Sequence, residues 1–499
     1  MRPSRSLVGD SLMPTVPITR SPVHLLPDPR RLITKLYLPV DVSPAEGRAR
    51  VERLVNRILA LTSDEAKDTL DGLRMASGEQ YPDFDEVLLQ GFSEVAHLVP
   101  DAAGLSADWQ RVIGAYFMHR YSLEGAALTN PSIVPAPDQT GVPDGSLRVI
   151  VSVRAVGEGH ISSIEFRTGM VGPGGDIELA AAGSPVTGAR QLPTFDKAVF
   201  TAKLTEMGVA DDLVAQAVGR LEDRFTMAHL DEALADLERR VASSSSVQHA
   251  AQGMHWLASS NYQVTFPPES ELSQRVLFPA GPSESQGMED ARLVRFAEQD
   301  GSVVYYATYT AFDGFGILPQ LIETTDFEDF RISTLNGGAA RNKGMAVFPR
   351  RVAGRYAALG RCDGESNYIM LSDNPRFWHD AEQIQVPTRP WELMQIGNAG
   401  APIETEAGWL VVTHGVGPMR RYALGAILLD IDDPRRVIGQ LREPLLVPNE
   451  RERHGYVPNV VYSCGSLIHG DRLVIAYGAS DTSTNFATAQ VDALLAELT

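Results

Sequence analysis

Similar β-rich units recur along this chain, and their repetition constrains the fold more than any other feature. Each unit has an apolar run, a turn that contains glycine, a second apolar run and a closing polar residue. Four units cover residues 291–314, 345–364, 401–418 and 459–481, and residues 130–158 have the same shape. Units of roughly 40–50 residues built from several short strands are typical of β-propellers. The pattern therefore predicts a mainly β fold with a five-bladed β-propeller, against the alternative of a β-sandwich with similar hairpins.

The polar residues that close the units are candidates for a shared site. In a propeller, the ends of equivalent strands converge on one mouth. The residues expected to meet there are Arg154, Tyr309, Arg361, His414 and Asp481.

Helical patterns precede and interrupt the β-rich region. Residues 1–123 combine an extended arm with a helical region, in which apolar residues recur at steps of three and four. A second helical block at about 195–262 predicts an insertion between strands. We therefore expect an N-terminal helical unit followed by a propeller domain at 124–499. Because helical appendages often serve oligomerisation, we also expect a homo-oligomer.

Composition limits the partners and the compartment. The chain of 499 residues has a formal net charge of −19, which argues against binding nucleic acid or an anionic membrane surface. A local group of arginines can still create a pocket for an anionic small molecule. Cys362 and Cys464 are the only cysteines, so we expect no disulfide framework. The first thirty residues contain no continuous apolar run, and no later stretch approaches the roughly 20 apolar residues of a membrane span. A cytoplasmic protein is expected.

The stretch GMEDARLVRF, residues 287–296, places two carboxylates and an arginine where an apolar strand begins. Side chains alternate along a strand, so Asp290 and Arg292 are expected on one face and Glu289 on the other. Asp290 could be a catalytic acid, an acceptor for a sugar hydroxyl, or half of a structural ion pair. The stretch taken alone favours the ion pair.

A second polar cluster, Arg341, Asn342 and Lys343, lies in a loop flanked by glycines. A guanidinium, an amide and nearby backbone N–H groups suit a phosphate or sulfate, although a solvated basic loop is the commoner structure. Arg361 strengthens the first interpretation, because an arginine between an apolar run and a Cys-Asp-Gly turn is poorly explained by packing. His414 follows valines and precedes two glycines, and by itself could equally be a hydrogen-bonded core residue.

The chain lacks the usual motifs for metals and nucleotides. Its eleven histidines form no HExxH motif, and the two cysteines are far apart. It contains no GxxxxGK[ST] motif and no nucleophile-elbow serine. We therefore expect neither a metal nor a bound cofactor.

The number of available acids has mechanistic content. Most glycosidases need two carboxylates, one that protonates the leaving oxygen and one that attacks or activates water. An enzyme that cleaves with inorganic phosphate needs only the acid, because the phosphate is the nucleophile and a cationic pocket holds it. Asp290 together with Arg341, Arg361 and His414 favours phosphorolysis, with inorganic phosphate as the co-substrate.

From Asn130 onward the sequence resembles glycoside hydrolase family 130, the inverting β-mannoside phosphorylases and related β-1,2-mannosidases. The resemblance depends on NPS (130–132), SVRA (152–155), GMEDARL, RNKGMAVFPR, LGRCDG, QIGNAGAPIETEAGWLVVTHGV and YGASD, in that order. It implies a five-bladed propeller, in agreement with the repeats.

The resemblance also implies roles for individual residues. Asp290 would be the general acid, relaying its proton to the glycosidic oxygen through the 3-hydroxyl of the mannosyl unit. The phosphate would be held by Arg341, Asn342, Arg361 and His414, with Lys343 beside them. The substrate would be bound by Asn130, Ser132, Arg154, Glu289, Arg292, Tyr309 and Asp481.

Two positions depart from the family pattern. Ala291 replaces the proline of the usual Glu-Asp-Pro-Arg motif, which is a minor change. Gln395 stands where many family phosphorylases have a lysine before Ile-Gly. One positive phosphate contact is therefore absent unless Lys343 supplies it.

Three functions stay open from the sequence. The first is phosphorolysis of a β-mannoside, with β-1,2 linkage favoured, which releases α-mannose 1-phosphate reversibly. The second is a β-1,2-mannosidase, whose catalytic base would have to be Glu404, Glu365 or Glu289. The third is a propeller without catalytic activity that binds a glycan or a protein.

Overall fold

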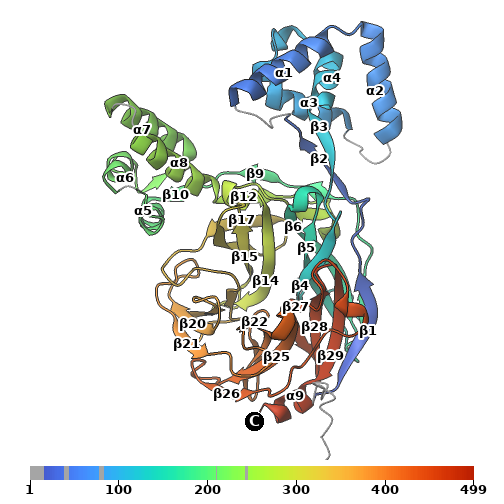
Figure 1. Cartoon of the computed structure of the whole chain (residues 1–499), viewed down its shortest axis with the longest axis vertical. Coiled ribbons are helices and arrows are strands. Elements are labelled where there is room, and N and C mark those ends of the chain that lie inside the picture. Colours follow the sequence, from blue (N-terminus) through green and yellow to red (C-terminus); the bar gives the residue numbers. More distant parts are fainter. Residues whose placement is uncertain (1–15, 39–43, 78–83, 210, 242–244, 499) are drawn as a thin grey trace, which may run out of the picture. The chain divides into compact units, whose positions relative to one another are not determined.

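The computed structural model describes residues 16–38, 44–77, 84–209, 211–241 and 245–498. The chain divides into two compact units, one formed by Pro29–Leu123 and a larger one formed by Glu124–Thr499 with the N-terminal arm up to Asp28. Figure 1 shows the elements of both units. Among the described residues, no helix is both long and apolar enough to span a bilayer.

The smaller unit is mainly helical. Its elements are β2 (Leu32–Leu36), α1 (Pro44–Leu59), α2 (Ser63–Ser77), α3 (Phe84–Val95), α4 (Ala107–Tyr116) and β3 (Met118–Ser122), with short 3₁₀ turns at Ala96–Leu98 and Ala102–Gly104. Strands β2 and β3 pair antiparallel. The helices enclose their own core, in which Val55, Ile113 and Phe117 are fully buried. Ser106 caps α4 by accepting a hydrogen bond from the Trp109 N–H.

The larger unit is mainly β, as the sequence predicts. In the described part of the chain its strands form one twelve-stranded sheet, a five-stranded sheet and two four-stranded sheets, besides one two-stranded pair. The twelve-stranded sheet consists of two groups that a single pairing joins, so five largely antiparallel groups can be distinguished. The first group contains β4 (Ala127–Pro135), β5 (Leu147–Val156), β6 (Ser162–Val171), β7 (Ile177–Leu179), β8 (Val186–Thr187) and β13 (Arg275–Leu277). The second contains β14 (Gly287–Ala297), β15 (Val303–Phe312), β16 (Ile317–Thr324), β17 (Asp329–Thr334), β12 (Tyr262–Thr265) and β9 (Ala189–Gln191). A single parallel pairing of Gly287 with Ser162 joins these two groups.

Three further groups follow along the chain. The third contains β18 (Ala346–Val347), β19 (Tyr356–Gly360), β20 (Asn367–Ser372) and β21 (Glu382–Gln385). The fourth contains β22 (Gln395–Asn398), β23 (Ile403–Thr405), β24 (Gly408–Val416), β25 (Tyr422–Leu429) and β26 (Val437–Gln440). The fifth contains β27 (Val461–His469), β28 (Arg472–Ala479) and β29 (Ser483–Gln490), and α9 (Val491–Glu497) follows it.

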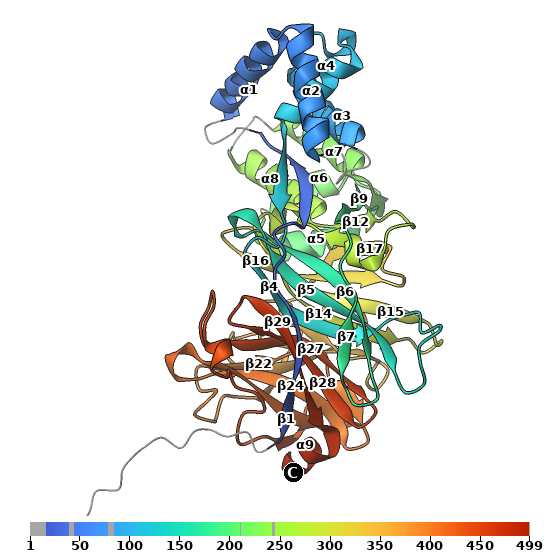
Figure 2. The same ribbon diagram turned by 90° about the vertical axis from the view of Figure 1, so that its right-hand side faces the viewer.

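The N-terminal arm completes the fifth group. Strand β1 (Ile18–Leu25) pairs antiparallel with β29, so the two ends of the chain share one sheet. Figure 2 shows β1 alongside this sheet. The sequence placed the arm with the helical region, but its backbone hydrogen bonds tie β1 to the larger unit.

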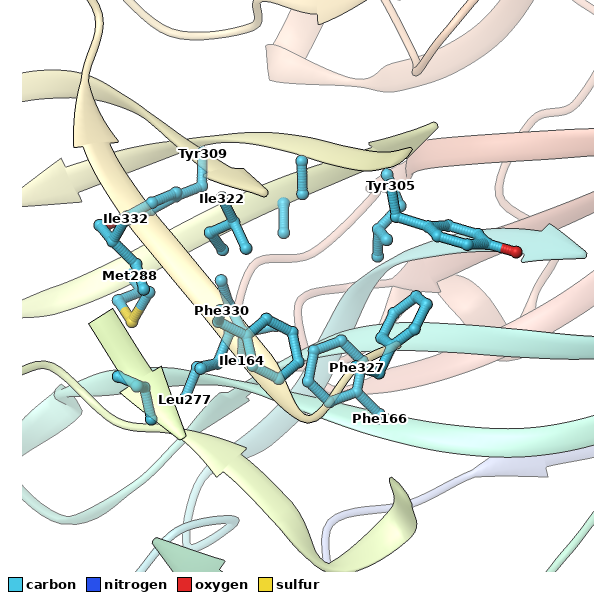
Figure 3. Packing of buried hydrophobic residues seen from close by; sticks show 14 of the residues in the cluster. Ile164, Phe166, Leu277, Met288, Tyr305, Tyr309, Ile322, Phe327, Phe330 and Ile332 are labelled. Atoms are coloured by element: carbon cyan, nitrogen blue, oxygen red, sulfur yellow. The ribbon is translucent and has the colours of Figure 1, made fainter. Parts of the chain in front are cut away.

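Aromatic side chains fill the space between strands of the first two groups. Phe166 of β6 stacks on Phe330 of β17 with ring centroids 5.7 Å apart, and its edge meets Phe327. Tyr305 of β15 contacts Phe327 at 4.8 Å. Figure 3 shows these rings together with Tyr309. Such pairs add to the stabilisation from burial of their apolar surface.

Left-handed bulges interrupt the strands that lead to the candidate site. In β4 the register shifts between Thr129 and Ser132, and Asn130 has φ of 49°. In β14 it shifts between Glu289 and Arg292, and Asp290 has φ of 58°. A bulge breaks the regular alternation of side chains and redirects the bulged residue. The strands thus turn Asn130 and Asp290 out of the pattern that a regular strand would impose.

A helical insertion lies between β10 (Phe195–Asp196) and β12. It consists of α5 (Lys197–Glu206), α6 (Asp211–Val218), α7 (Met227–Arg240) and α8 (Ser245–Ser259), and β11 (Arg224–Phe225) pairs with β10. The helices form a separate hydrophobic cluster. Helix α5 also holds the start of the loop before β18, because Lys203 Nζ donates to the Leu335 carbonyl at 2.8 Å and Glu206 Oε1 accepts from the Gly337 N–H at 2.7 Å.

We predict that Glu206→Ala loosens this loop. The Gly337 N–H would lose its acceptor, which costs about 1–3 kcal/mol of unfolding free energy for a group removed from water. Hydrogen–deuterium exchange should accelerate at Gly337 and its neighbours. Glu238→Ala on the exposed face of α7 is the matched control and should leave exchange there unchanged. Identical exchange in both variants would show that α5 does not hold the loop.

Candidate active site

A cavity of about 270 Å³ opens in the larger unit. All five strand groups and the loops between them contribute to its walls. The lining residues are Asn130, Arg154, Glu289, Asp290, Lys343, Arg361, Gln395, His414, Arg420, Tyr422, Val457, Val460, Tyr462 and Asp481. Eight of the thirteen site residues predicted from the sequence line the cavity, and Gln395, which departs from the family pattern, lines it as well. The eight are Asn130, Arg154, Glu289, Asp290, Lys343, Arg361, His414 and Asp481.

The Asp290 carboxylate is buried and surrounded by donors. Asn130 Nδ2 donates to its Oδ1 at 2.6 Å, and Arg154 Nη1 lies 3.7 Å from the same oxygen. Burial disfavours the charged carboxylate, but the charges of Arg154, Arg292 and Lys343 outweigh it. The pKa of Asp290 therefore lies below its ordinary value. Asp290 is therefore ionised at neutral pH.

Glu289 also faces the cavity, contrary to the expectation from strand alternation. The bulge at Asp290 places both side chains on the cavity side. Glu289 Oε1 accepts from Arg154 Nη2 at 2.7 Å, and its Oε2 accepts from Lys343 Nζ at 2.6 Å. Two cations thus occupy both oxygens of this carboxylate.

Arg292 does not line the cavity but supports the bulge from behind. Its Nη1 donates to the backbone carbonyl of Asp290 at 3.1 Å, and its Nη2 donates to the Tyr462 hydroxyl at 2.6 Å. Its Nε donates to Asn398 Oδ1 at 3.2 Å. Arg292 is fully buried, so these bonds fix the backbone of Asp290 relative to β22 and β27.

Arg361 and His414 form one end of the cavity. His414 Nδ1 lies 3.0 Å from the Asn398 carbonyl, and its Nε2 lies 3.3 Å from Arg361 Nη1. Burial, followed by the charges of Arg361 and Arg292, lowers the pKa of His414 well below its ordinary value. The ring is therefore neutral, donates from Nδ1 to the carbonyl and accepts from Arg361 at Nε2. His414 orients the guanidinium and adds no positive charge.

Arg361 supplies a positive charge at this end of the cavity, beside the neutral His414. Gln395 of β22, which pairs with β24, lines the cavity where the family pattern has a lysine. Lys343 lines the cavity as well, bonded to Glu289.

Two residues predicted to bind phosphate lie outside the lining. Asn342 Nδ2 donates to the Cys362 carbonyl at 2.7 Å, with Asn342 at φ of 62°. The positive charge of Arg341 also acts on the Cys362 thiol. In this structure both side chains face the Cys362 turn, and their predicted contact with phosphate stays a prediction.

Ser132 is also outside the lining, although it belongs to the same assembly. It is fully buried, and its hydroxyl accepts from the Leu293 N–H at 3.1 Å, which ties β4 to β14 just beyond the two bulges. Gly465 of β27 lies directly against Ser132, and a Cβ at Gly465 would lie 2.2 Å from the Ser132 Oγ. The glycine therefore allows β27 to approach β4 closely.

Tyr309 does not lie at the cavity, and its expected place at a common mouth is wrong. Its hydroxyl donates to Glu284 Oε2 at 2.6 Å within a buried network that also includes Gln320. Figure 3 shows the Tyr309 ring beside Ile332, inside the core. The neighbouring Thr308 takes the opposite face of β15, so strand alternation turns Tyr309 away from the site.

Asp481 faces the cavity from the turn after β28, with φ of 48°. Burial, followed by repulsion from Asp290, raises the pKa of the Asp481 carboxyl. The charges of Arg154 and Arg420 act in the opposite direction. The two aspartates therefore have pKa values displaced in opposite directions, as often happens when two carboxyl groups share one site.

Some lining residues were not identified from the sequence. Tyr462 accepts the hydrogen bond from Arg292, and its ring packs against His414 with centroids 4.8 Å apart. Tyr422 and Arg420 lie at and before the start of β25, outside the repeated positions. Of these three residues, only Tyr462 could have been found from the sequence, because it lies near the start of β27 as Asp290 lies near the start of β14.

No group of three or more His, Cys, Asp or Glu residues suited to a metal ion occurs in the part of the chain that the structure describes.

The other two candidate bases lie outside the cavity. Glu404 is paired through both oxygens with Arg350, at 2.8 and 2.6 Å. Glu365 is not in the lining.

A cavity that combines carboxylates, guanidinium groups and an amide is typical of enzymes that act on sugars, and comparisons with known proteins agree. A family model described as β-1,4-mannooligosaccharide phosphorylase matches residues 243–498, more than half of the chain. The chain belongs to this family, glycoside hydrolase family 130, which confirms the resemblance seen in the sequence.

Individual relatives show how far the similarity extends. A 1,2-β-oligomannan phosphorylase of Thermoanaerobacter sp. (strain X514) is 35% identical over 213 residues, which are 40% of this chain and 67% of the relative. A β-1,2-mannobiose phosphorylase of Listeria innocua is 32% identical over 230 residues, 44% of this chain and 63% of the relative. The solved structure of that enzyme type from Listeria innocua, with β-1,2-mannobiose, aligns with a TM-score of 0.44 at 22% identity, over 76% of this chain and 93% of the other.

We predict that His414 makes the protein less stable in mild acid. The unfolded chain binds a proton at His414 near the ordinary pKa of 6.5, whereas the folded chain resists it. The stabilisation is therefore complete above pH 6.5 and is lost as the pH falls towards the lower folded pKa, by up to about 1.4 kcal/mol per pH unit.

Denaturant unfolding between pH 7.5 and 5 measures this effect. The unfolding free energy of the wild type should fall more steeply on acidification than that of His414→Gln. His469→Gln, which changes a more exposed histidine at the end of β27, should keep the wild-type slope. Equal slopes in the wild type and His414→Gln would show that His414 does not titrate between the two states.

Proposed function

We propose that this protein is a β-mannoside phosphorylase, which cleaves β-1,2-linked mannosides with inorganic phosphate and releases α-mannose 1-phosphate and a shortened acceptor. Family membership and the names of the relatives support a mannoside phosphorylase. The observation that carries the proposal is the end of the cavity at Arg361. There the Arg361 guanidinium is held by a neutral His414, in a cavity that Lys343 also lines.

The architecture supports the same proposal. Five successive strand groups send residues to one cavity, which is the arrangement that a five-bladed propeller would produce. We therefore propose that the larger unit is such a propeller. The two buried, unpaired cysteines are compatible with a cytoplasmic enzyme, and the expected homo-oligomer stays a prediction.

In the proposed reaction, a phosphate oxygen held by Arg361 and Lys343 attacks the anomeric carbon of the mannosyl unit. The bond from that carbon to the acceptor oxygen breaks on the opposite face, so the configuration inverts. Asp290 passes a proton to the acceptor oxygen through the mannosyl 3-hydroxyl, as the family resemblance implies. Hydrogenphosphate brings one proton and the acceptor leaves with one, so protons and charge balance.

The low pKa of Asp290 fits this order of events. The cations around Asp290 favour its ionised form, which cannot act as an acid. A phosphate dianion would neutralise Lys343 and Arg361, and its negative charge would favour protonation of Asp290. Binding of phosphate would thus prepare the acid as well as supply the nucleophile.

The arrangement is less suited to hydrolysis. An inverting hydrolase needs a free carboxylate to activate water on the side opposite the leaving group. Glu289 is engaged by Arg154 and Lys343, while Glu404 is engaged by Arg350 outside the cavity. Asp481 faces the cavity, but burial and repulsion from Asp290 raise the pKa of its carboxyl, which makes it less suited to act as a base.

We predict that Asp290→Asn abolishes turnover of β-1,2-mannobiose. The amide keeps the size of the side chain and can still contact Asn130, but it cannot deliver a proton. Turnover should fall at least about a thousandfold, within the range that loss of general acid catalysis produces. The measurement is formation of mannose 1-phosphate with and without phosphate. Asp300→Asn, in an exposed turn, is the matched control and should keep full activity.

Two outcomes would contradict this assignment. Near-native activity of Asp290→Asn would show that another group is the acid. Release of free mannose by the wild type without phosphate would show that the protein is a β-1,2-mannosidase, and no turnover of any mannoside would favour a binding protein.

We predict that Arg361→Ala raises the KM for phosphate by about 10- to 100-fold, because a hydrogen bond to a charged group contributes about 1.5–3 kcal/mol. The KM for the mannoside should change little. Initial rates at varied phosphate measure the effect, and Arg355→Ala, an exposed arginine paired with Asp373, is the control. An unchanged KM for phosphate would place the anion elsewhere.

A further inference from the structure

The turn that carries Asp481 has a strained backbone. Ser480 and Asp481 both have positive φ, of 48° each, in the turn between β28 and β29. Non-glycine residues in this left-handed conformation persist only where the surroundings hold them. Among the described residues, no hydrogen bond reaches the Asp481 carboxylate, although it lines the cavity. The position of this carboxylate therefore depends on the contacts that hold the backbone of the turn.

The loop before β27 holds the turn by main-chain hydrogen bonds. The Ser480 N–H donates to the Val460 carbonyl at 2.8 Å, and the Val457 N–H donates to the Ser480 carbonyl at 3.0 Å. Gly455 allows this close approach, because a Cβ there would lie 2.6 Å from the Ser480 Cβ and 2.5 Å from the Thr482 hydroxyl oxygen. Since Val457 and Val460 also line the cavity, the loop and the turn form one part of its wall.

Glu452 anchors the base of this loop. Its backbone carbonyl accepts from the Ser480 hydroxyl at 2.5 Å, which is a third bond between the loop and the turn. Its side chain is buried, and Oε1 accepts from the Tyr477 hydroxyl of β28 at 2.6 Å. Oε2 accepts from the Asn449 N–H at 2.9 Å, within the same loop. A buried carboxylate requires a positive partner as well as neutral donors.

The N-terminal arm supplies that partner. Arg20 of β1 donates from Nε to Glu452 Oε1 at 3.1 Å and from Nη2 to Glu452 Oε2 at 3.0 Å. Its Nη2 also donates to the Val447 carbonyl at 2.7 Å, earlier in the connection between β26 and β27. A bidentate pair of guanidinium and carboxylate fixes orientation as well as distance. Two steps, from Arg20 to Glu452 and from Glu452 to Ser480, thus link the arm to the residue before Asp481.

Strand β1 supports the same turn through its main chain. It pairs with β29, where Leu25 lies opposite Thr484, two residues beyond the turn at 480–482. The arm therefore contacts both sides of the turn, because β1 pairs with the strand that leaves it and Arg20 bonds the loop that packs on it.

We propose that Arg20 and Glu452 are positioning residues of the sugar site, and that the N-terminal arm completes this site by holding Asp481 through Ser480. The inference rests on the proposed function, in which Asp481 contacts the mannosyl unit. The phosphate end, at Arg361 and His414, lies on β24 and just after β19, in other strand groups. Disturbance of the arm should thus weaken binding of the mannoside and leave binding of phosphate unchanged.

Initial rates at varied β-1,2-mannobiose and varied phosphate test this division. Arg20→Ala should raise the KM for β-1,2-mannobiose about 3- to 10-fold, the size expected for one hydrogen-bonded contact, and should leave the KM for phosphate unchanged. Arg20→Lys keeps the charge but not the bidentate geometry, so it should recover part of the loss.

Arg376→Ala is the matched control for the loss of an ion pair. Arg376 is paired with Glu323 outside the cavity lining, and 28% of its side chain is exposed, compared with 32% for Arg20. Its removal should cost comparable stability and leave both KM values unchanged. The comparison separates a positioning effect on the sugar site from general destabilisation.

A double-mutant cycle shows whether Arg20 acts through Ser480. Ser480→Ala removes the hydroxyl that bonds the Glu452 carbonyl, and it should also raise the KM for β-1,2-mannobiose about 3- to 10-fold. If both residues belong to one chain of contacts, the combined variant should be no worse than either alone, whereas independent effects would multiply. Ser480→Ala also tests the link without breaking the ion pair, should Arg20→Ala fail to fold.

Hydrogen–deuterium exchange provides a readout that does not require turnover. Arg20→Ala should accelerate exchange at the amides of Val457 and Ser480, which join the loop and the turn. Arg376→Ala should leave exchange at these amides unchanged.

The possible outcomes are distinct. Unchanged exchange in Arg20→Ala would overturn the proposal and leave the proposed function untouched. Faster exchange with an unchanged KM for β-1,2-mannobiose, equal increases in both KM values, or multiplied effects in the combined variant would also overturn it. Absence of turnover of any mannoside by the wild type would refute the proposed function and with it the role in sugar binding, whereas the exchange result would still show whether the arm holds the turn.

Discussion

The site depends on the left-handed backbone at Asp290. A regular strand would direct Glu289 and Asp290 to opposite faces, and only the bulge brings both carboxylates to the cavity. An aspartate at φ of 58° costs about 1–3 kcal/mol and persists only where the surroundings fix it. Here Arg292 donates a hydrogen bond to the backbone carbonyl of Asp290, and Asn130 donates one to the Asp290 carboxylate. Further along β14, the Leu293 N–H donates to the Ser132 hydroxyl. These contacts come from different strand groups, so the fold as a whole holds the strained residue in place.

Electrostatics give the two ends of the cavity different properties. His414 is a buried imidazole that remains neutral, and its role is to orient the Arg361 guanidinium by a hydrogen bond. Lys343 carries its positive charge as a compact ammonium group at the end of a flexible side chain. Lys343 Nζ donates to Glu289 Oε2 at 2.6 Å, so an incoming anion must compete with a carboxylate for the same ammonium group. The absence of the usual lysine at Gln395 makes this competition more important.

The repeats in the sequence predicted that residues from several units would share one site, but they did not predict the backbone geometry of that site. Arg154, Arg361, His414 and Asp481 close successive units and do share the cavity, because equivalent strand ends come together. The place of Asp290 in the cavity could also be predicted from its motif, whereas its role as the acid stays a prediction. The prediction for Tyr309 was wrong because it considered only where a unit ends and not which face of the strand each side chain takes. The predicted orientation of Glu289 was wrong because simple alternation of side chains does not reveal a bulge. Arg420 lines the cavity from a turn outside the repeats, so the repeat pattern gave no indication of it.

The link between Glu289 and its two cations connects the halves of the site. Arg154 contacts both Glu289 and the neighbourhood of Asp290, at 2.7 and 3.7 Å. If phosphate draws Lys343 away, Glu289 retains Arg154 as its sole bonded cation, and Arg154 is then held more firmly by Glu289 than by Asp290. Both changes reduce the positive charge that keeps Asp290 ionised. Through its two bonded cations, Glu289 can thus make the acid respond to the arrival of the nucleophile, which is the order that phosphorolysis requires and hydrolysis does not.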